Sequence, residues 1–141
     1  APFSIKKGTN IYGLIFGSAN LRGIEKFLNV CWKEDKERGE ANFDIDEDNL
    51  TPHQPSLFRE MNLPNKINVF EAELKKNILS KKLITDYDVY KFSLFSGCLP
   101  RHARDVIKQL KREKRIEKDK QGTRLRLSFE SSKDPRPIKV L

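Results

Sequence analysis

Three patterns in the sequence predict an α+β fold. Near the N-terminus, short apolar runs flank one amphipathic segment. Two further amphipathic segments are separated by a glycine and a proline just before residue 101, and residues that alternate between polar and apolar follow them. Two helices joined by a tight glycine-containing turn form a helix-turn-helix, and a hairpin after them adds a wing. We therefore expect a C-terminal winged helix-turn-helix preceded by a small strand-helix-strand segment.

The same patterns divide the chain into four parts. Residues 1–50 form the strand-helix-strand segment, 51–65 a proline-containing connection, 66–130 the winged helix-turn-helix and 131–141 a tail. A chain of 141 residues, 37% of them apolar, suits one ordinary core. No run approaches the roughly 20 apolar residues of a membrane helix, and no secretory signal is visible, so we expect a cytoplasmic protein without membrane contact. Because an apolar strand follows Ala1 so closely, we expect a fragment of a longer protein.

The N-terminal part combines a strand and a helix. Residues 11–16 are an unbroken apolar run, which is typical of a buried strand. A helix ending near Trp32 should follow, since apolar residues then recur at the spacing i, i+3, i+4, i+7. Those residues are Ile24, Phe27, Leu28 and Cys31.

A short acidic strand is expected next, where Phe43 and Ile45 alternate with three aspartates. Alternation places Asp44, Asp46 and Asp48 on one face, where they either bind a divalent metal or face solvent. A calcium loop of the EF-hand type would need glycine and glutamate where the chain has Asn49 and Pro55. We therefore favour a solvated face and expect no metal.

The first two helices of the C-terminal part are predicted from their start and stop signals. Asn68, with Glu71 three residues later, resembles a capping box for a helix that runs to about Lys82. Thr85 should cap the next helix, which carries acidic residues in its first turn. That helix must end near Phe95, because Gly97 and Pro100 follow and proline suits the start of a new helix.

The third helix separates apolar from basic residues. Ala103, Val106, Ile107 and Leu110 form a narrow apolar stripe that should face the core. The cations project from another side of the helix. They are Arg101, Arg104, Lys108, Lys111, Arg112 and Arg115. A helix of this kind can enter the major groove, where arginine reads guanine and lysine contacts phosphate.

A basic hairpin should form the wing. The chain passes from Arg115 through a tip containing Gly122 into residues 124–129, where Leu125, Leu127 and Phe129 alternate with polar residues. The wing cations are Lys118, Lys120, Arg124 and Arg126. A solvated hairpin without nucleic-acid contact is the alternative.

The location of the charge supports a polyanionic partner. The net charge is +8, and residues 100–141 hold 14 Lys/Arg against 6 Asp/Glu, whereas the rest of the chain holds 14 of each. A one-sided positive field of this kind attracts polyanions. We favour double-stranded DNA over RNA as the partner. The alternatives are a protein-interaction module bracing an upstream domain and, less favoured, a metal nuclease using the three aspartates.

Enzymatic motifs are absent from the sequence. It has no glycine-rich phosphate loop, no paired-cysteine motif and no HExxH. Zinc would require Cys31, Cys98, His53 and His102 to converge from distant positions, so we favour reduced core thiols. We expect this fragment to be no enzyme and to use no cofactor.

A family resemblance adds context to these expectations. The segments IYGLIFGSAN, GIEKFLNVCWKED and GEANFDID, followed by a winged helix, make most of the chain similar to the C-terminal part of the three-Cys-motif partner proteins. The resemblance implies a methyltransferase-like Rossmann region upstream and a partner protein with three cysteines that resembles radical-SAM proteins. The chain itself contains no methyltransferase glycine loop, and the resemblance assigns no residue a catalytic role.

Overall fold

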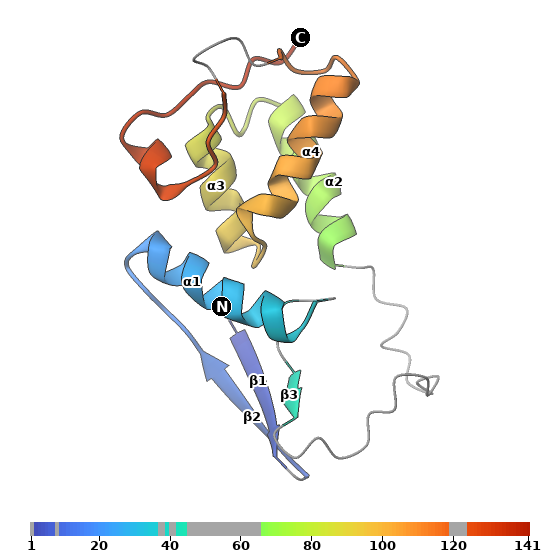
Figure 1. The fold of residues 1–141 in the computed structure, drawn as a ribbon. Coiled ribbons are helices and arrows are strands. Elements are labelled where there is room, and N and C mark those ends of the chain that lie inside the picture. The colour runs from blue at the N-terminus through green and yellow to red at the C-terminus, as the bar shows by residue number, and fades with distance from the viewer. Residues whose placement is uncertain (1, 8, 37–38, 40–41, 45–65, 119–123) are drawn as a thin grey trace.

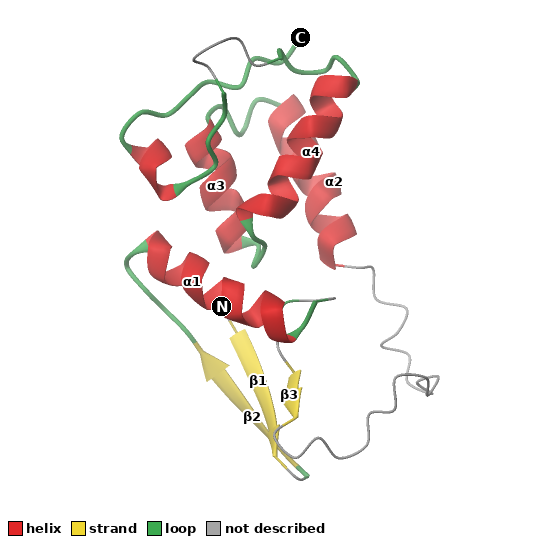
Figure 2. Ribbon diagram, viewed as in Figure 1, coloured by secondary structure: helices red, strands yellow, loops and turns green. Residues whose placement is uncertain are grey.

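The computed structural model describes residues 2–7, 9–36, 39, 42–44, 66–118 and 124–141. In Figure 1 the C-terminal helices lie above the N-terminal helix, with a small sheet below that helix. The elements are β1 (Pro2–Lys7), β2 (Asn10–Ile15), α1 (Leu21–Glu34), β3 (Asn42–Asp44), α2 (Lys66–Leu79), α3 (Asp86–Phe95), α4 (Pro100–Arg112) and the 3-10 helix η2 (Phe129–Ser132). The chain is thus an α+β protein in which helices predominate (Figure 2).

The N-terminal sheet has the strand order β2-β1-β3. β1 pairs antiparallel with β2 and parallel with β3. The strand predicted at residues 11–16 is β2, which lies at the edge of the sheet with Ile15 91% exposed, so the expectation of a buried strand is wrong. β1, which precedes it, was not predicted. β3 ends at Asp44, and the other two aspartates of the acidic pattern, Asp46 and Asp48, lie outside the described residues together with the whole connection 51–65.

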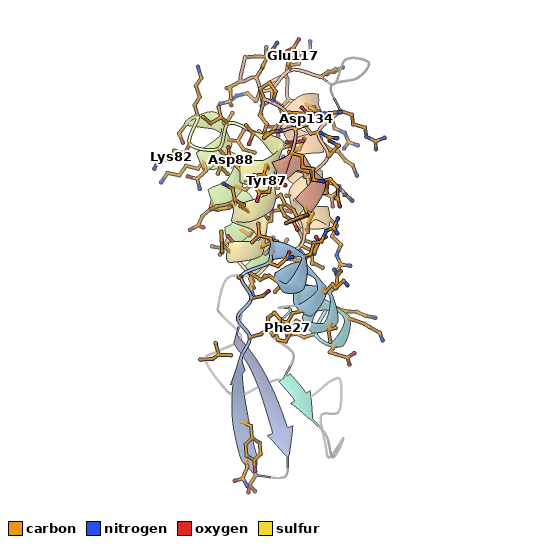
Figure 3. The ribbon with its side chains drawn as sticks, turned by 90° about the vertical axis from the view of Figure 1, so that its left-hand side faces the viewer. Phe27, Lys82, Tyr87, Asp88, Glu117 and Asp134 are labelled. Atoms are coloured by element: carbon orange, nitrogen blue, oxygen red, sulfur yellow. The ribbon has the colours of Figure 1, made fainter. Side chains whose placement is uncertain are left out.

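Helix α1 starts at a side-chain cap and buries one face. The Oδ1 of Asn20 accepts the Arg22 N–H at 2.9 Å, which satisfies a backbone donor at the helix start. Leu28 and Cys31, both in the predicted apolar pattern, are buried. Phe27 stacks on Phe16 at 4.4 Å and lies below α1, on the side of the strands (Figure 3).

Helix α2 buries the predicted side but starts earlier than predicted. It begins at Lys66, so Asn68 lies inside the helix and the predicted capping box with Glu71 is wrong. The Asn68–Glu71 pattern gave a wrong helix start because residues with capping side chains also occur on the solvent-exposed face of a helix. Asn68 is such an exposed residue. The helix ends at Leu79, three residues before the predicted end. Its predicted apolar positions Phe70, Leu74 and Ile78 are buried.

The turn between α3 and α4 matches the sequence prediction. The Thr85 Oγ1 accepts the Asp88 N–H, and the Asp88 carboxylate accepts the Thr85 N–H, each at 3.1 Å, which confirms the cap at Thr85. Helix α3 ends at Phe95 and Pro100 is the first residue of α4, as predicted. Gly97 has φ = 68°, a backbone conformation that glycine adopts without steric cost.

Three short extended segments close the C-terminal part. The Ile138 N–H donates to the Ile84 carbonyl at 2.7 Å, and the Glu117 N–H donates to the Lys139 carbonyl at 2.8 Å. Residues 136–141 therefore lie between the segment before α3 and the segment after α4. Residues 131–141 are therefore not the tail that the sequence predicted, and Ile138 is buried in the core.

The predicted return strand of the wing, residues 124–129, is wrong. Residues 124–127 have no strand partner, Leu127 has φ = 43°, and η2 begins at Phe129. The alternating pattern still has a structural basis, because Leu127 is only 2% exposed while Leu125 and Phe129 pack on the core. The segment that pairs with Ile116 is instead residues 136–141, so residues 124–135 lie between the two paired segments in the sequence, and we call residues 124–135 the wing excursion.

Buried Asp86 holds this excursion to α3. One carboxylate oxygen accepts the Arg126 N–H at 3.0 Å, and the other accepts the Arg136 N–H at 2.9 Å. The Asp86 N–H in turn donates to the Arg136 carbonyl at 2.9 Å. A single side chain therefore satisfies backbone donors at both ends of the segment that contains η2.

Helix α1 packs directly on the winged helix-turn-helix. The Trp32 Nε1–H donates to the Gly97 carbonyl at 2.9 Å, and the Tyr90 hydroxyl donates to Glu25 at 2.8 Å. Arg22 forms an ion pair with Glu130 of η2 and lies 4.8 Å from the Phe129 ring centre. Trp32 and Leu28 belong to the same hydrophobic core as α2, α3 and α4.

Candidate nucleic-acid interface

The apolar side of α4 is fixed in the core. Ala103, Val106, Ile107 and Leu110 are all buried, which confirms the predicted stripe. α4 lies against both α2 and α3 (Figure 1). Because these four side chains lock the rotation of the helix, its opposite side has a defined orientation relative to the rest of the domain.

The opposite side of α4 presents cations to solvent. Arg101, Arg104, Lys108, Arg112 and Arg115 are exposed, while Lys111 is half-buried and has contacts of its own. Two acidic residues lie on α4 or directly after it. Asp105 pairs with Lys108 at 3.1 Å, and Glu113 accepts a hydrogen bond from Gln109 at 2.7 Å. Arg104 and Arg112 form no ion pair with any residue that the structure describes, so both remain available to an external anion.

The wing cations differ in availability. Lys118 and Arg124 are exposed, and Lys120 lies outside the described residues. Arg126 instead points back to its own chain, where its guanidinium donates to the Asp134 carboxylate at 2.7 Å and to the Asp134 carbonyl at 2.8 Å. A guanidinium already held by a carboxylate must lose that contact before it can bind a phosphate.

His102 supports the start of α4, a role that was not predicted from the sequence, where this residue was considered only as a zinc ligand. Its Nδ1 accepts the Leu99 N–H at 3.2 Å, and its ring meets the Trp32 ring edge-on at 4.5 Å. A neutral imidazole accepts at one nitrogen only, so Nε2 carries the proton and the 3.3 Å approach of the Arg101 Nε is a contact without a hydrogen bond. The imidazole thus satisfies a free backbone donor at the N-terminus of the basic helix.

The environment of His102 predicts a pH dependence of stability. Burial, and then the neighbouring Arg101, lower the pKa of His102 from its ordinary value of 6.5, while Asp105 acts weakly in the other direction. The unfolded chain therefore binds this proton at a higher pH than the folded chain. The stabilisation is complete above pH 6.5 and is lost as the pH falls from there through the folded pKa.

We expect His102→Asn to flatten this dependence, since the Asn Oδ1 can accept the Leu99 N–H but does not titrate. The measurement is the free energy of unfolding in urea between pH 7.5 and pH 5. The wild type should lose more stability over this range than the variant, and equal losses would contradict the assignment.

The two cysteines are buried free thiols, as predicted. Burial raises the pKa of the Cys98 thiol to about 11 and also raises that of Cys31. Thiols in this state are poor nucleophiles and poor metal ligands. Among the described residues no three His, Cys, Asp or Glu side chains are grouped to hold a metal, and His53 lies outside them.

The order α2, α3, turn, α4 and a segment pairing after it is that of a winged helix-turn-helix. A family model described as the GMT-like wHTH domain matches residues 44–123, which is more than half of the chain. The chain belongs to this family. No curated protein and no solved structure matches it.

The GMT-like wHTH match covers the helix-turn-helix and the start of the wing, and thus the whole of α4. It supports the winged helix-turn-helix part of the sequence prediction. The resemblance to three-Cys-motif partner proteins stays a prediction. None of the helices that the structure describes is long and apolar enough to span a membrane.

Proposed function

We propose that this GMT-like wHTH domain binds double-stranded DNA through the exposed face of α4. The observation that carries the proposal is the separation of the two sides of α4: four buried apolar residues fix the helix, and the cations on the other side include two arginines without an ion pair among the described residues. Such a helix can lie in the major groove with arginines on base edges and lysines on phosphates.

The geometry of the groove favours DNA over RNA. B-form DNA has a major groove wide enough for an α-helix, whereas the major groove of A-form RNA is deep and narrow. α4 is a regular helix of 13 residues, and its Asp105 pairs with Lys108, which leaves Arg104 and Arg112 without an acidic partner among the described residues. Duplex DNA is therefore the ligand that this surface fits best.

Salt dependence tests the proposal. The measurement is fluorescence anisotropy of the chain with a random-sequence duplex at several salt concentrations. Four to six phosphate contacts should give a slope of about −4 to −5 for log affinity against log salt. A slope near zero, or no binding at low salt, would refute the proposal.

The described contacts predict different roles for two arginines that sequence alone treats alike. Arg104→Ala should weaken duplex binding roughly 5- to 100-fold, because it removes a guanidinium that has no ion pair among the described residues. The same change should leave stability nearly unchanged. Arg126→Ala should leave binding nearly unchanged, because its guanidinium is engaged with Asp134. Anisotropy and urea denaturation of both variants provide the comparison. Equal losses of affinity would show that Arg126 leaves Asp134 to bind DNA.

A second candidate function is that of an assembly module. In this role the chain would brace an upstream domain or a partner protein of the three-cysteine class. Large apolar side chains on the described surface support it: Ile15 is 91% exposed, Phe95 73% and Leu141 75%. The test is co-purification of a partner that survives nuclease and high salt. Replacing Phe95 with Ser should then release the partner without changing duplex binding.

A further inference from the structure

Two helices of the winged helix-turn-helix end in the same way, with a lysine in the left-handed backbone conformation. Lys81 follows α2 with φ = 58°, and Lys114 follows α4 with φ = 54°. Each helix end forms the same pair of hydrogen bonds. Lys81 and Lys82 donate to the carbonyls of Ile78 and Asn77, and Lys114 and Arg115 donate to those of Lys111 and Leu110.

This hydrogen-bond pattern is the Schellman motif, in which glycine is the usual residue at the left-handed position. A lysine there keeps its Cβ in a crowded conformation, so the fold would be more stable with glycine. The helix dipole does not explain the choice of lysine at these two positions. Other residues of the last turn can supply the positive charge that stabilises the C-terminal end of a helix. The chain therefore keeps two strained lysines at equivalent places where stability alone favours another residue.

The two helix ends lie at the same end of the domain, opposite α1 (Figure 1). The segment 138–141 joins them, because Ile138 pairs with Ile84 beyond the first end and Leu141 donates to the Arg115 carbonyl at the second. With strands about 4.8 Å apart, the lateral spacing of the two outer segments is roughly 10 Å, and they are offset along the middle segment, since Thr85 pairs with Pro137 and Ile116 with Val140. Five exposed cations lie on or next to these segments, and we name them the helix-end surface: Lys81, Lys82, Lys114, Arg115 and Lys139.

The charge of this surface is only partly balanced. Glu117 lies 3.5 Å from Lys139. Lys81, Lys82, Lys114 and Arg115 have no side-chain ion pair with any described residue. Arg112, in the last turn of α4, connects the surface to the basic side of that helix. A polyanion lying along α4 would therefore meet the helix-end surface when it continues past the C-terminal end of α4.

We propose that the helix-end surface binds phosphates of the same duplex, beyond the part contacted by α4. This inference rests on the proposed function and extends it, since it assigns a second contact and predicts a longer footprint. α4 itself is about 20 Å long and follows the major groove, so it contacts fewer than the roughly six base pairs that 20 Å along the duplex axis would hold. Contact with the helix-end surface requires a longer duplex.

The experiment uses the double variant Lys81→Gly/Lys114→Gly and two duplexes of about 8 and 16 base pairs. Glycine relieves the backbone strain, so the urea midpoint should rise. Affinity for the longer duplex should fall by about tenfold, and the salt slope should become shallower by about two, one for each lost phosphate contact. Affinity for the shorter duplex should change little. A variant that is more stable but binds the longer duplex more weakly would show that the two lysines contribute to DNA binding and not to stability.

Three controls make the outcome decisive. Lys26→Ala/Lys133→Ala removes two exposed charges on α1 and at the end of η2, and should leave the affinity for both duplexes nearly unchanged. Lys81→Arg/Lys114→Arg keeps the charge and should keep the affinity. Lys81→Asn/Lys114→Asn repeats the test with another residue that tolerates the left-handed region, should the glycine variant fail to fold.

The outcomes separate this inference from the proposed function. If the glycine variant binds both duplexes as the wild type does, while changes on α4 weaken binding, the helix-end surface is not a contact and the DNA-binding proposal stands. An equal loss on both duplexes would place the lysines inside the α4 footprint and overturn the longer footprint. If the wild type binds neither duplex, both proposals fall.

Discussion

Reversing the charge of Arg104, Lys108 and Arg112 is expected to abolish duplex binding. All three side chains are exposed on the basic side of α4. Lys108 pairs with Asp105, whereas Arg104 and Arg112 have no ion pair among the described residues, and each reversal places a negative charge beside phosphate or guanine. A single good contact of this kind contributes about 1–3 kcal/mol, so the triple glutamate variant should lose at least about 100-fold in affinity. Anisotropy at low salt measures the loss.

A matched control separates the position of the charges from their number. The triple variant Lys26→Glu, Lys33→Glu and Lys133→Glu changes the net charge equally but alters exposed residues of α1 and the end of η2. This control should retain most of the affinity for duplex. If both triple variants lose binding alike, a diffuse positive field holds the DNA and α4 has no special role.

Replacing the buried Asp86 with alanine is expected to destabilise the fold strongly. The carboxylate is fully buried and accepts two backbone hydrogen bonds, from Arg126 and Arg136. Its loss leaves two backbone donors without an acceptor, and each such donor costs about 1–3 kcal/mol. Urea denaturation should show a loss of roughly 2–5 kcal/mol.

Asp134 provides the comparison for Asp86. It also contacts Arg126, but through an ion pair at the surface, where Asp134 is 71% exposed. Surface pairs contribute little, so Asp134→Ala should change stability by less than about 1 kcal/mol. If Asp134→Ala destabilised the chain as much as Asp86→Ala, the guanidinium of Arg126 rather than its backbone would hold the wing excursion.

Local signals allowed the helix-turn-helix to be predicted from sequence. The cap at Thr85, the glycine in the turn and Pro100 each act within a few residues, and the structure has all three where expected. The burial of Val106 and the exposure of Arg104 follow from helical periodicity alone. The start of α2 was missed because capping residues also occur inside helices, as Asn68 does.

The pairing after α4 could not be predicted, because it depends on contacts between distant residues. Residues 124–129 alternate as a strand does, yet the strand partner of Ile116 is Val140. Alternation reports which side chains face the core and does not report which segment supplies the hydrogen bonds. The role of Asp86 was missed for the same reason, since its backbone partners at Arg126 and Arg136 are distant in sequence. The cap by His102 is local, three residues from Leu99, and was missed because histidine is not among the usual capping residues.

The position of residues 136–141 between two earlier segments has a consequence for the order of folding during synthesis. A nascent chain that has reached residue 130 already contains α2, α3 and α4, but it lacks Ile138 and the backbone partners of Ile84, Arg115 and Glu117. Until translation passes residue 141, the three helices leave an apolar gap and two unpaired strand edges exposed, which are features that favour misassembly. Residues 136–141 therefore complete the core and the backbone pairing, and a chain arrested before them should be an early target for chaperones.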